Sequence, residues 1–151
     1  MLKESSTHPI FDIRRGYSIG LSAWSKAILE GNIDDILDRL KANSAIHKQK
    51  DLDDAETRKS AVTGLRQLVK KLTLSILDKK RFDFVLECCY SLMEDYKVDR
   101  RGDIGSMVRE KTMYCFLDLV QKVCNPKVTD HDRRNYLSPE TLSKIIGCLL
   151  Q

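Results

Sequence analysis

Hydrophobic residues recur along this chain at spacings of three and four, which is the periodicity of amphipathic helices. Near the N-terminus Ile13, Tyr17, Leu21, Trp24 and Ile28 follow this spacing, and signals for strands are nearly absent from the whole chain. The pattern therefore predicts an all-α fold of about six helices. The expected helices cover residues 12–29, 32–40, 53–72 with a stretch reaching toward 77, 81–96, 103–123 and 138–151.

Polar residues at the expected helix starts agree with these boundaries. Asp12, Asn32 and Asp53 each stand where a side chain can accept a hydrogen bond from an unpaired backbone N–H, and Glu56 follows Asp53 at the capping-box distance. The run Ser138-Pro139-Glu140 combines a cap, a first-turn proline and a first-turn acid. Each of these residues predicts where a helix begins.

A faint internal repeat appears when Arg14, Arg58 and Arg109 are placed in register. The two spacings are 44 and 51 residues. Units of about 40 to 47 residues built from helix pairs are typical of HEAT and armadillo solenoids. The sequence thus predicts an α-solenoid of HEAT/armadillo-like helix pairs.

This architecture divides the chain into an N-terminal tail, residues 1–11, and a helical-repeat domain, residues 12–151. Since the first and last helices would each be half of a pair, we expect a fragment of a longer solenoid that exposes apolar surface at one or both ends. Trp24, the single tryptophan, is expected in the core, or else as an anchor for a neighbouring repeat.

Composition and charge narrow the classes of protein. Hydrophobic residues make up 42% and charged residues 32%, which is typical of a folded chain. The 26 basic and 22 acidic residues give a net charge of +4 that is evenly spread, so nucleic acid is not an expected partner. The longest uncharged run, Gly16 to Ser25, is far too short for a membrane span of about 20 residues. No membrane insertion and a cytoplasmic location are expected, because the N-terminus also lacks the apolar core of a signal peptide.

The residues that often carry chemistry do not form a catalytic or metal-binding pattern. The five cysteines are an odd number on helix-like segments and are expected to be buried, protonated thiols. His8, His47 and His131 lie far apart in expected loops, so no metal site is predicted. Gly102 to Gly105 lacks the length and the lysine of a phosphate-binding loop. We expect no catalytic residue and no cofactor.

Arginines at the helix starts have two interpretations. Arg14, Arg58 and Arg109 are expected to pair with acids of adjoining repeats in a ladder that fixes the stacking. Arg100 and Arg101 lie in an expected loop, where a guanidinium can present its planar fork to a carboxylate of a partner protein.

The segment from residue 99 to 110 reads Asp-Arg-Arg-Gly-Asp-Ile-Gly-Ser-Met-Val-Arg-Glu. It resembles a run in the C-terminal part of the tubulin-folding cofactor D family, which has an acid, Arg-Gly-Asp, a β-branched residue, Gly-Ser, a large apolar residue and Val-Arg-Glu or Val-Arg-Lys. Leu92 to Tyr96 and Ile13 to Leu21 resemble further stretches of that family, so the similarity covers about residues 12–123. Residues 1–10 and 127–136 carry no family signature, and Lys111 to Met113 stand where the family has small residues.

The resemblance implies a cytosolic chaperone of HEAT/armadillo-type repeats that binds β-tubulin and supports its assembly with α-tubulin. It also implies other tubulin-folding cofactors and an Arf-like small GTPase as partners, with microtubules or the centrosome as further locations. In such a system GTP hydrolysis occurs on tubulin, so the chain is expected to be a scaffold and not an enzyme.

The candidate residues for partner contact are Arg100, Arg101 and Asp103, followed by Arg14 and Arg15. One alternative is a GTPase-activating or GTPase-regulating element that acts on tubulin or the small GTPase, with Arg101 as an added arginine that stabilises the transferring phosphoryl group. Another is a generic helical-repeat adaptor with an unrelated protein cargo.

Overall fold

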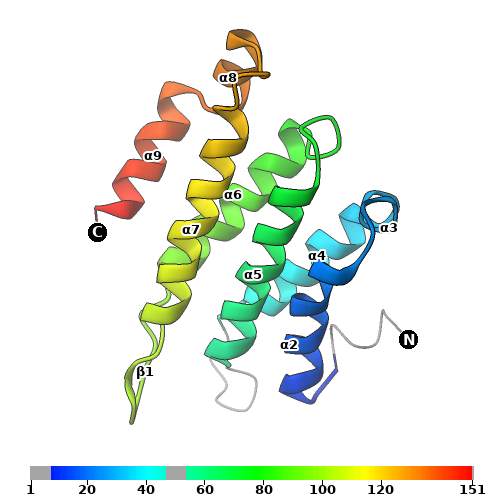
Figure 1. Ribbon diagram of the computed structural model, residues 1–151. Coiled ribbons are helices and arrows are strands. Elements are labelled where there is room, and N and C mark those ends of the chain that lie inside the picture. The colour runs from blue at the N-terminus through cyan, green and yellow to red at the C-terminus, as the bar shows by residue number, and fades with distance from the viewer. Residues whose placement is uncertain (1–7, 47–53, 151) are drawn as a thin grey trace.

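The computed structural model describes residues 8–46 and 54–150. Within these ranges the fold is all-α, as predicted, apart from one short hairpin (Figure 1). The elements are α2 (Phe11–Gly20), the 3-10 helix η1 (Leu21–Ala23), α3 (Lys26–Gly31), α4 (Ile33–Ser44), α5 (Ala55–Lys71), α6 (Lys79–Met93), β1 (Val98–Asp99), β2 (Gly102–Asp103), α7 (Ser106–Val123), α8 (Asp130–Tyr136) and α9 (Pro139–Leu149).

The long helices pack in two layers. Helix α5 lies between α2 and α7 in one layer, and it rests on α4 of the other layer (Figure 1). Helix α6 contacts α4 and α9 within the second layer and lies against α7. Figure 1 shows α2, α5 and α7 running in one direction and α4, α6 and α9 in the opposite direction. The core between the layers is closed by large apolar side chains that are almost fully buried, among them Leu40, Leu65, Leu68, Phe82 and Phe116.

The expected first helix is interrupted. The α-helix ends at Gly20, η1 follows, and Trp24 adopts an extended backbone with ψ of 144°. The side chain of Ser25 then accepts a hydrogen bond from the backbone N–H of Ile28 and starts α3. Serine favours a helix cap over a helix interior, because its hydroxyl competes for backbone hydrogen bonds. The prediction of one helix over residues 12–29 is therefore wrong.

Two of the predicted caps act differently in the structure. Helix α2 begins after Ile10 without a side-chain cap, and Asp12 instead forms an ion pair with Arg15. Asn32 precedes α4, but its side-chain amide donates to the carbonyl of Ile28 and caps the end of α3. Neither side chain therefore accepts a hydrogen bond from a backbone N–H at the start of the helix that it was predicted to cap.

The other helix starts agree more closely with the sequence. Asp53 lies outside the described residues, and the neighbouring Asp54 accepts from the backbone N–H of Thr57 at the start of α5. Ser138 caps α9 as predicted, by accepting from the backbone N–H of Thr141.

Helix α8 lies in the stretch for which no helix was predicted. Thr129 caps it by accepting from the backbone N–H of Asp132 at 3.1 Å. Its one buried residue, Tyr136, packs edge-on against Phe82 and donates its hydroxyl to the carbonyl of Leu74 at 3.0 Å. The short helix therefore fastens the approach to α9 onto the α5–α6 loop.

Two lysines join neighbouring helices of the first layer in the same way. Lys71 at the end of α5 donates to the carbonyls of Ser22 and Trp24, just beyond α2. Lys122 near the end of α7 donates to the carbonyl of Leu72, just beyond α5. Each lysine satisfies a carbonyl at the C-terminal end of the preceding helix, where backbone acceptors have no partner within their own helix.

Candidate functional site

The segment that carries the resemblance forms a hairpin that projects beyond the N-terminal end of α7 (Figure 1). Strands β1 and β2 are antiparallel, with Val98 opposite Asp103 and Asp99 opposite Gly102. Gly102 has a φ of 103°, a backbone conformation that residues with a Cβ atom rarely adopt. Arg100 and Arg101 form the exposed turn between the two strands. We call residues 96–103 the arginine hairpin.

A buried ion pair fixes the base of the arginine hairpin. The guanidinium of Arg58 in α5 donates from Nε to Oδ2 of Asp95 at 2.7 Å and from Nη2 to Oδ1 at 3.2 Å. Arg58 is 1% exposed and Asp95 is fully buried. The carboxylate also accepts from the backbone N–H of Lys97 at 3.3 Å. Since a buried charge is costly without a partner, this pair holds the start of the hairpin against α5.

Gly105 permits the close approach of the two ends of the hairpin. A Cβ atom at this position would lie 2.0 Å from the backbone oxygen of Asp95, which no side chain can tolerate. The backbone N–H of Gly105 instead donates to the carbonyl of Lys97 at 3.1 Å. The second glycine of the Arg-Gly-Asp-Ile-Gly run is therefore required by packing.

Asp103 ties the end of the hairpin to the first turn of α7. Its carboxylate accepts from Nη2 of Arg109 at 2.6 Å and from the backbone N–H of Ser106 at 3.0 Å. The hydrogen bond from Arg109 lowers the pKa of Asp103 below its usual value. Arg109 also donates to the backbone carbonyl of Asp95. Asp103, a predicted partner-contact residue, thus already has partners within this protein, namely Arg109 and the first turn of α7.

The two arginines of the turn differ in their surroundings. Arg101 donates from Nε to the carboxylate of Asp99 at 2.9 Å, and this hydrogen bond raises the pKa of Arg101 and lowers that of Asp99. Its side chain remains 66% exposed. Arg100 is exposed and forms no ion pair within the described ranges. Val98 on β1 is also exposed, whereas Tyr96 at the base lies under the guanidinium of Arg109, 4.5 Å from the centre of its ring. The tip therefore presents two cations to solvent.

The remaining arginines show which part of the expected ladder exists. Arg15 forms a bidentate pair with Asp54 of α5, with its shortest contacts at 2.7 Å, and Arg58 pairs with Asp95 beyond α6. Arg14 instead donates to the carbonyl of His8 at 2.6 Å and lies over the ring of Phe11. Arg58 therefore pairs with an acid of another segment, as the prediction expected. The prediction is wrong for Arg14, in place of which Arg15 forms the pair, and for Arg109, which pairs with Asp103 just before its own helix.

The cysteines divide into a buried group and two others. Cys88, Cys89 and Cys115 are buried as predicted. Burial raises the pKa of Cys88 to about 11, and a hydrogen bond with Cys115 together with burial raises that of Cys89. Cys148 is half-buried and Cys124 is exposed, so the prediction of five buried thiols is wrong for Cys124. With these raised pKa values, Cys88 and Cys89 are poor nucleophiles at neutral pH.

Neither of the two histidines that the structure describes belongs to a cluster that could hold a metal. His8 accepts from the backbone N–H of Ile10, His131 is exposed, and His47 lies outside the described residues. In the described part of the chain, no three His, Cys, Asp or Glu side chains gather closely enough to hold a metal ion.

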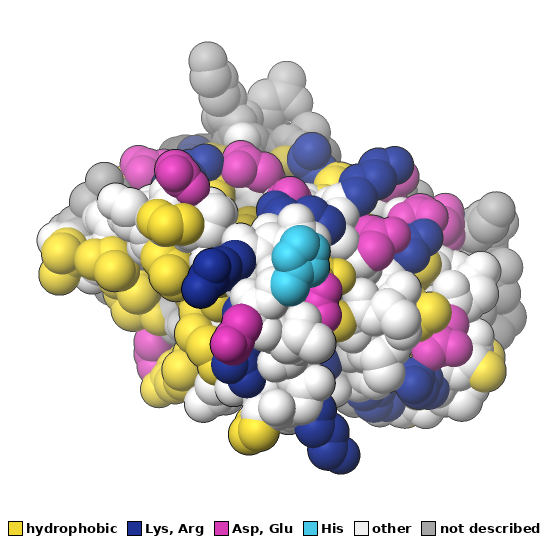
Figure 2. All heavy atoms as spheres, turned by 90° about the horizontal axis from the view of Figure 1, so that it is seen from above, with side chains coloured by type: hydrophobic (Ala, Val, Ile, Leu, Met, Phe, Trp, Pro, Cys, Tyr) yellow, Lys and Arg dark blue, Asp and Glu magenta, His cyan; other side chains and the backbone are white. Residues whose placement is uncertain are grey.

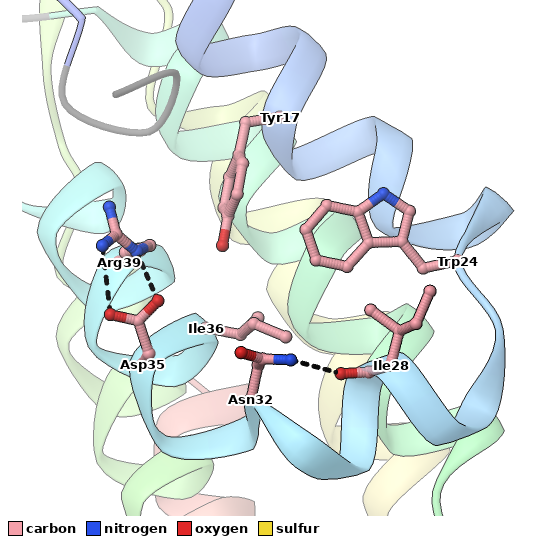
Figure 3. A pocket seen from close by; sticks show the side chains of 7 residues that line it. All are labelled: Tyr17, Trp24, Ile28, Asn32, Asp35, Ile36 and Arg39. Atoms are coloured by element: carbon pink, nitrogen blue, oxygen red, sulfur yellow. Dashed lines mark hydrogen bonds and ion pairs between the residues drawn. The ribbon is translucent and has the colours of Figure 1, made fainter. Parts of the chain in front are cut away.

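A pocket of about 180 Å³ that the sequence did not indicate opens between α2, α3 and α4 (Figure 3). Tyr17 and Trp24 form one wall, with their rings at 89° and 5.9 Å apart. Asp35 and Arg39 pair with each other at 2.8 Å on the opposite wall, and burial raises the pKa of Tyr17 to about 12. The remaining lining residues are Ile28, Asn32 and Ile36. Trp24 is thus half-buried, at the wall of a pocket and not deep in the core.

Comparisons with known proteins add no family to this geometry. No protein-family model matches the chain, and no solved structure matches it. None of the helices that the structure describes combines the length and the apolar surface that a membrane crossing requires.

Proposed function

We propose that this chain is a protein-binding scaffold, similar to the C-terminal repeat region of tubulin-folding cofactor D, and that it binds β-tubulin and supports assembly and disassembly of the tubulin heterodimer. Its architecture is then an α-solenoid of HEAT/armadillo-like helix pairs, with α4 paired to α5 and α6 to α7. Its further partners are other tubulin-folding cofactors and an Arf-like small GTPase, in the cytoplasm and at microtubules or the centrosome.

The arginine hairpin is the observation that carries this proposal. The family-like segment coincides with a hairpin that projects from the helices, and its base is fixed by the buried pair of Arg58 and Asp95. A fixed base with an exposed tip favours binding, because little conformational freedom is lost when a partner docks. The guanidinium groups of Arg100 and Arg101 suit carboxylates on that partner.

The two-layer packing supports a scaffold over an enzyme. Stacked helices offer a broad surface of many modest contacts. Cys88 and Cys89 are buried and their thiols have raised pKa values, which suits packing and not nucleophilic attack.

The test is co-migration with tubulin heterodimer, and separately with a GTP-loaded Arf-like GTPase, in size-exclusion runs at low and physiological salt. The double variant Arg100→Glu/Arg101→Glu should lose binding, because it reverses the charge of the tip without touching the base. The matched control is Lys127→Glu/Arg134→Glu, which makes the same charge change at exposed positions around α8. Equal binding by both double variants would contradict the proposal.

The GTPase-regulating alternative is tested with the same proteins. Arg101 is exposed, and its pair with Asp99 lies in solvent. The guanidinium of Arg101 could therefore leave Asp99 and bind a phosphate of a nucleotide without a steric clash. If Arg101 acts this way, Arg101→Ala should lower GTP turnover by tubulin or by the GTPase while binding persists. Binding of an unrelated cargo with no binding of either partner would favour the generic adaptor.

A further inference from the structure

Two opposite sides of the helix layers leave apolar surface uncovered in the described part of the chain. The first, which we call the α2 face, consists of Ile13, Gly16 and Gly20 together with the pocket beside Tyr17. The second, the α9 face, consists of Met113 and Leu117 of α7 with Leu142 and Ile146 of α9, all of them exposed. Figure 2 shows hydrophobic side chains gathered on the side of the molecule where α9 lies.

The internal repeat shows what covers such surfaces inside the molecule. In the register of Arg14 and Arg58, Gly20 corresponds to Gly64. A Cβ atom on Gly64 would lie 2.7 Å from Cδ2 of Leu40 and 3.1 Å from the carbonyl of Ser18, so α2 and α4 press closely on this glycine. Gly20 has nothing within 4 Å of its Cβ position. The α2 face therefore has a glycine where α5 has one for close helix packing, but no helix of this chain covers it in the described residues.

The same register identifies the α9 face as the other half of such a junction. Met113 corresponds to Val62 of α5 and to Ser18 of α2, which are both fully buried. Met113 is 42% exposed. Val120 corresponds to the fully buried Val69 and is only partly buried. Helix α7 therefore leaves open the positions that are covered in α2 and α5.

We propose that the α9 face of one copy of this chain binds the α2 face of a second copy, head to tail. In this arrangement α7 lies beside α2 of the next copy, as α2 lies beside α5 and α5 beside α7. Helix α9 then supports that α2 as α4 supports α5. The contact continues the packing already present inside the molecule, and this continuity favours a second copy over an unrelated occupant.

The pocket and its charges fit this occupant. A space of about 180 Å³ matches one large aliphatic side chain, such as Leu142 or Ile146 from α9. Asp35 and Arg39 on its wall already pair with each other, so covering them buries no unpaired charge. Both faces remove apolar surface from water when they bind, and this burial contributes the favourable free energy of association.

Because the two faces differ, the contact is heterologous and one copy can bind a neighbour at each end. The wild-type chain should therefore form a series of oligomers whose mean mass rises with concentration. It should not stop at a closed dimer. Sedimentation velocity and light scattering across the micromolar range measure this directly.

Two variants each close one face. Gly20→Trp places a large side chain in the open space of the α2 face, and Ile146→Glu places a charge on the α9 face. Both positions are uncovered, so each variant should keep the helical circular dichroism and the melting temperature of the wild type. Each variant alone should self-associate at least about tenfold more weakly, so that it is monomeric at concentrations at which the wild type forms oligomers.

An equimolar mixture of the two variants is the decisive measurement. Gly20→Trp keeps a functional α9 face and Ile146→Glu keeps a functional α2 face, so the mixture should form a heterodimer of twice the monomer mass and no longer species. The control Ile19→Glu, an exposed isoleucine of α2 outside the α2 face, should associate like the wild type. A monomeric wild type at every concentration, single variants that associate as strongly as the wild type, or a mixture that stays monomeric would each overturn the proposal.

Discussion

At the scale of single residues, the pair of Arg58 and Asp95 shows how a buried charge organises a site. The sequence singles out Arg58 through the repeat, yet its partner Asp95 stands 37 positions away and outside that repeat register. Only the packing of α5 against the segment after α6 brings the two together. The identity of an ionic partner at such a distance depends on three-dimensional register, which periodicity does not encode.

Removal of one member of this pair should be severe. Arg58→Met leaves the carboxylate of Asp95 buried without its cation, and the expected loss is about 3 to 5 kcal/mol in the free energy of unfolding. Urea denaturation followed by circular dichroism measures it. The control is Lys79→Met, which breaks an exposed pair with Asp83 and should cost at most about 1 kcal/mol. Similar losses for both variants would show that the buried pair has no special role.

Two glycines in helices should respond in opposite directions to alanine. Gly64→Ala should destabilise the protein, because the added Cβ meets Leu40 and the backbone of Ser18, and overpacking of this kind costs about 1 to 3 kcal/mol. Gly16→Ala meets open space, and the better helix propensity of alanine should stabilise α2 by up to about 1 kcal/mol. Thermal unfolding compares them, and a loss at Gly16 as large as that at Gly64 would contradict the packing argument.

At the scale of elements, the structure separates what periodicity can and cannot predict. Helices α4, α5, α6 and α7 follow from apolar spacing because each buries a regular stripe. Helix α9 has the same spacing, although it buries only Ile145 and leaves Leu142 and Ile146 exposed. Helix α8 has seven residues and buries only Tyr136, so it offers no stripe to detect, although Thr129 followed by Asp132 marks its cap. The strands of the arginine hairpin have two residues each, too few for any alternation to show.

The start of α5 should confer a measurable pH dependence. Burial alone would raise the pKa of Asp54, but hydrogen bonds from Thr57 and Arg15 outweigh it and lower the pKa below its usual 3.8. A lowered pKa in the folded state means that the stabilisation is present above the unfolded value and disappears as the pH falls through the folded value.

The variant Asp54→Asn isolates this charge, because asparagine remains a good cap. The free energy of unfolding of the wild type should exceed that of the variant by about 1 kcal/mol at neutral pH. The difference should shrink toward zero as the pH falls below 4, which urea titrations at a series of pH values would measure. A difference that stays constant with pH would exclude the ionised carboxylate as its source.

At the scale of the whole molecule, the cysteines offer a built-in probe of folding. Cys124 is exposed and should react with a thiol reagent within the first phase of labelling. Cys88, Cys89 and Cys115 lie in the core, so their reaction should await unfolding and should accelerate in urea in step with the loss of helix. Mass spectrometry of the labelled peptides assigns each site. Rapid labelling of Cys89 in the native protein would contradict the described core.

The lysines that join successive helices imply an order of opening. Each contact, Lys71 to the end of α2 and Lys122 to the end of α5, links nearest neighbours only. Helix α5 has packed neighbours on both sides, whereas α9 rests mainly on α6. Structure held by local links opens from its ends inward. Amide protons should therefore exchange with deuterium most slowly in α5 and progressively faster toward α2 and α9. Helix α5 would then be the last part of the chain to lose its native hydrogen bonds.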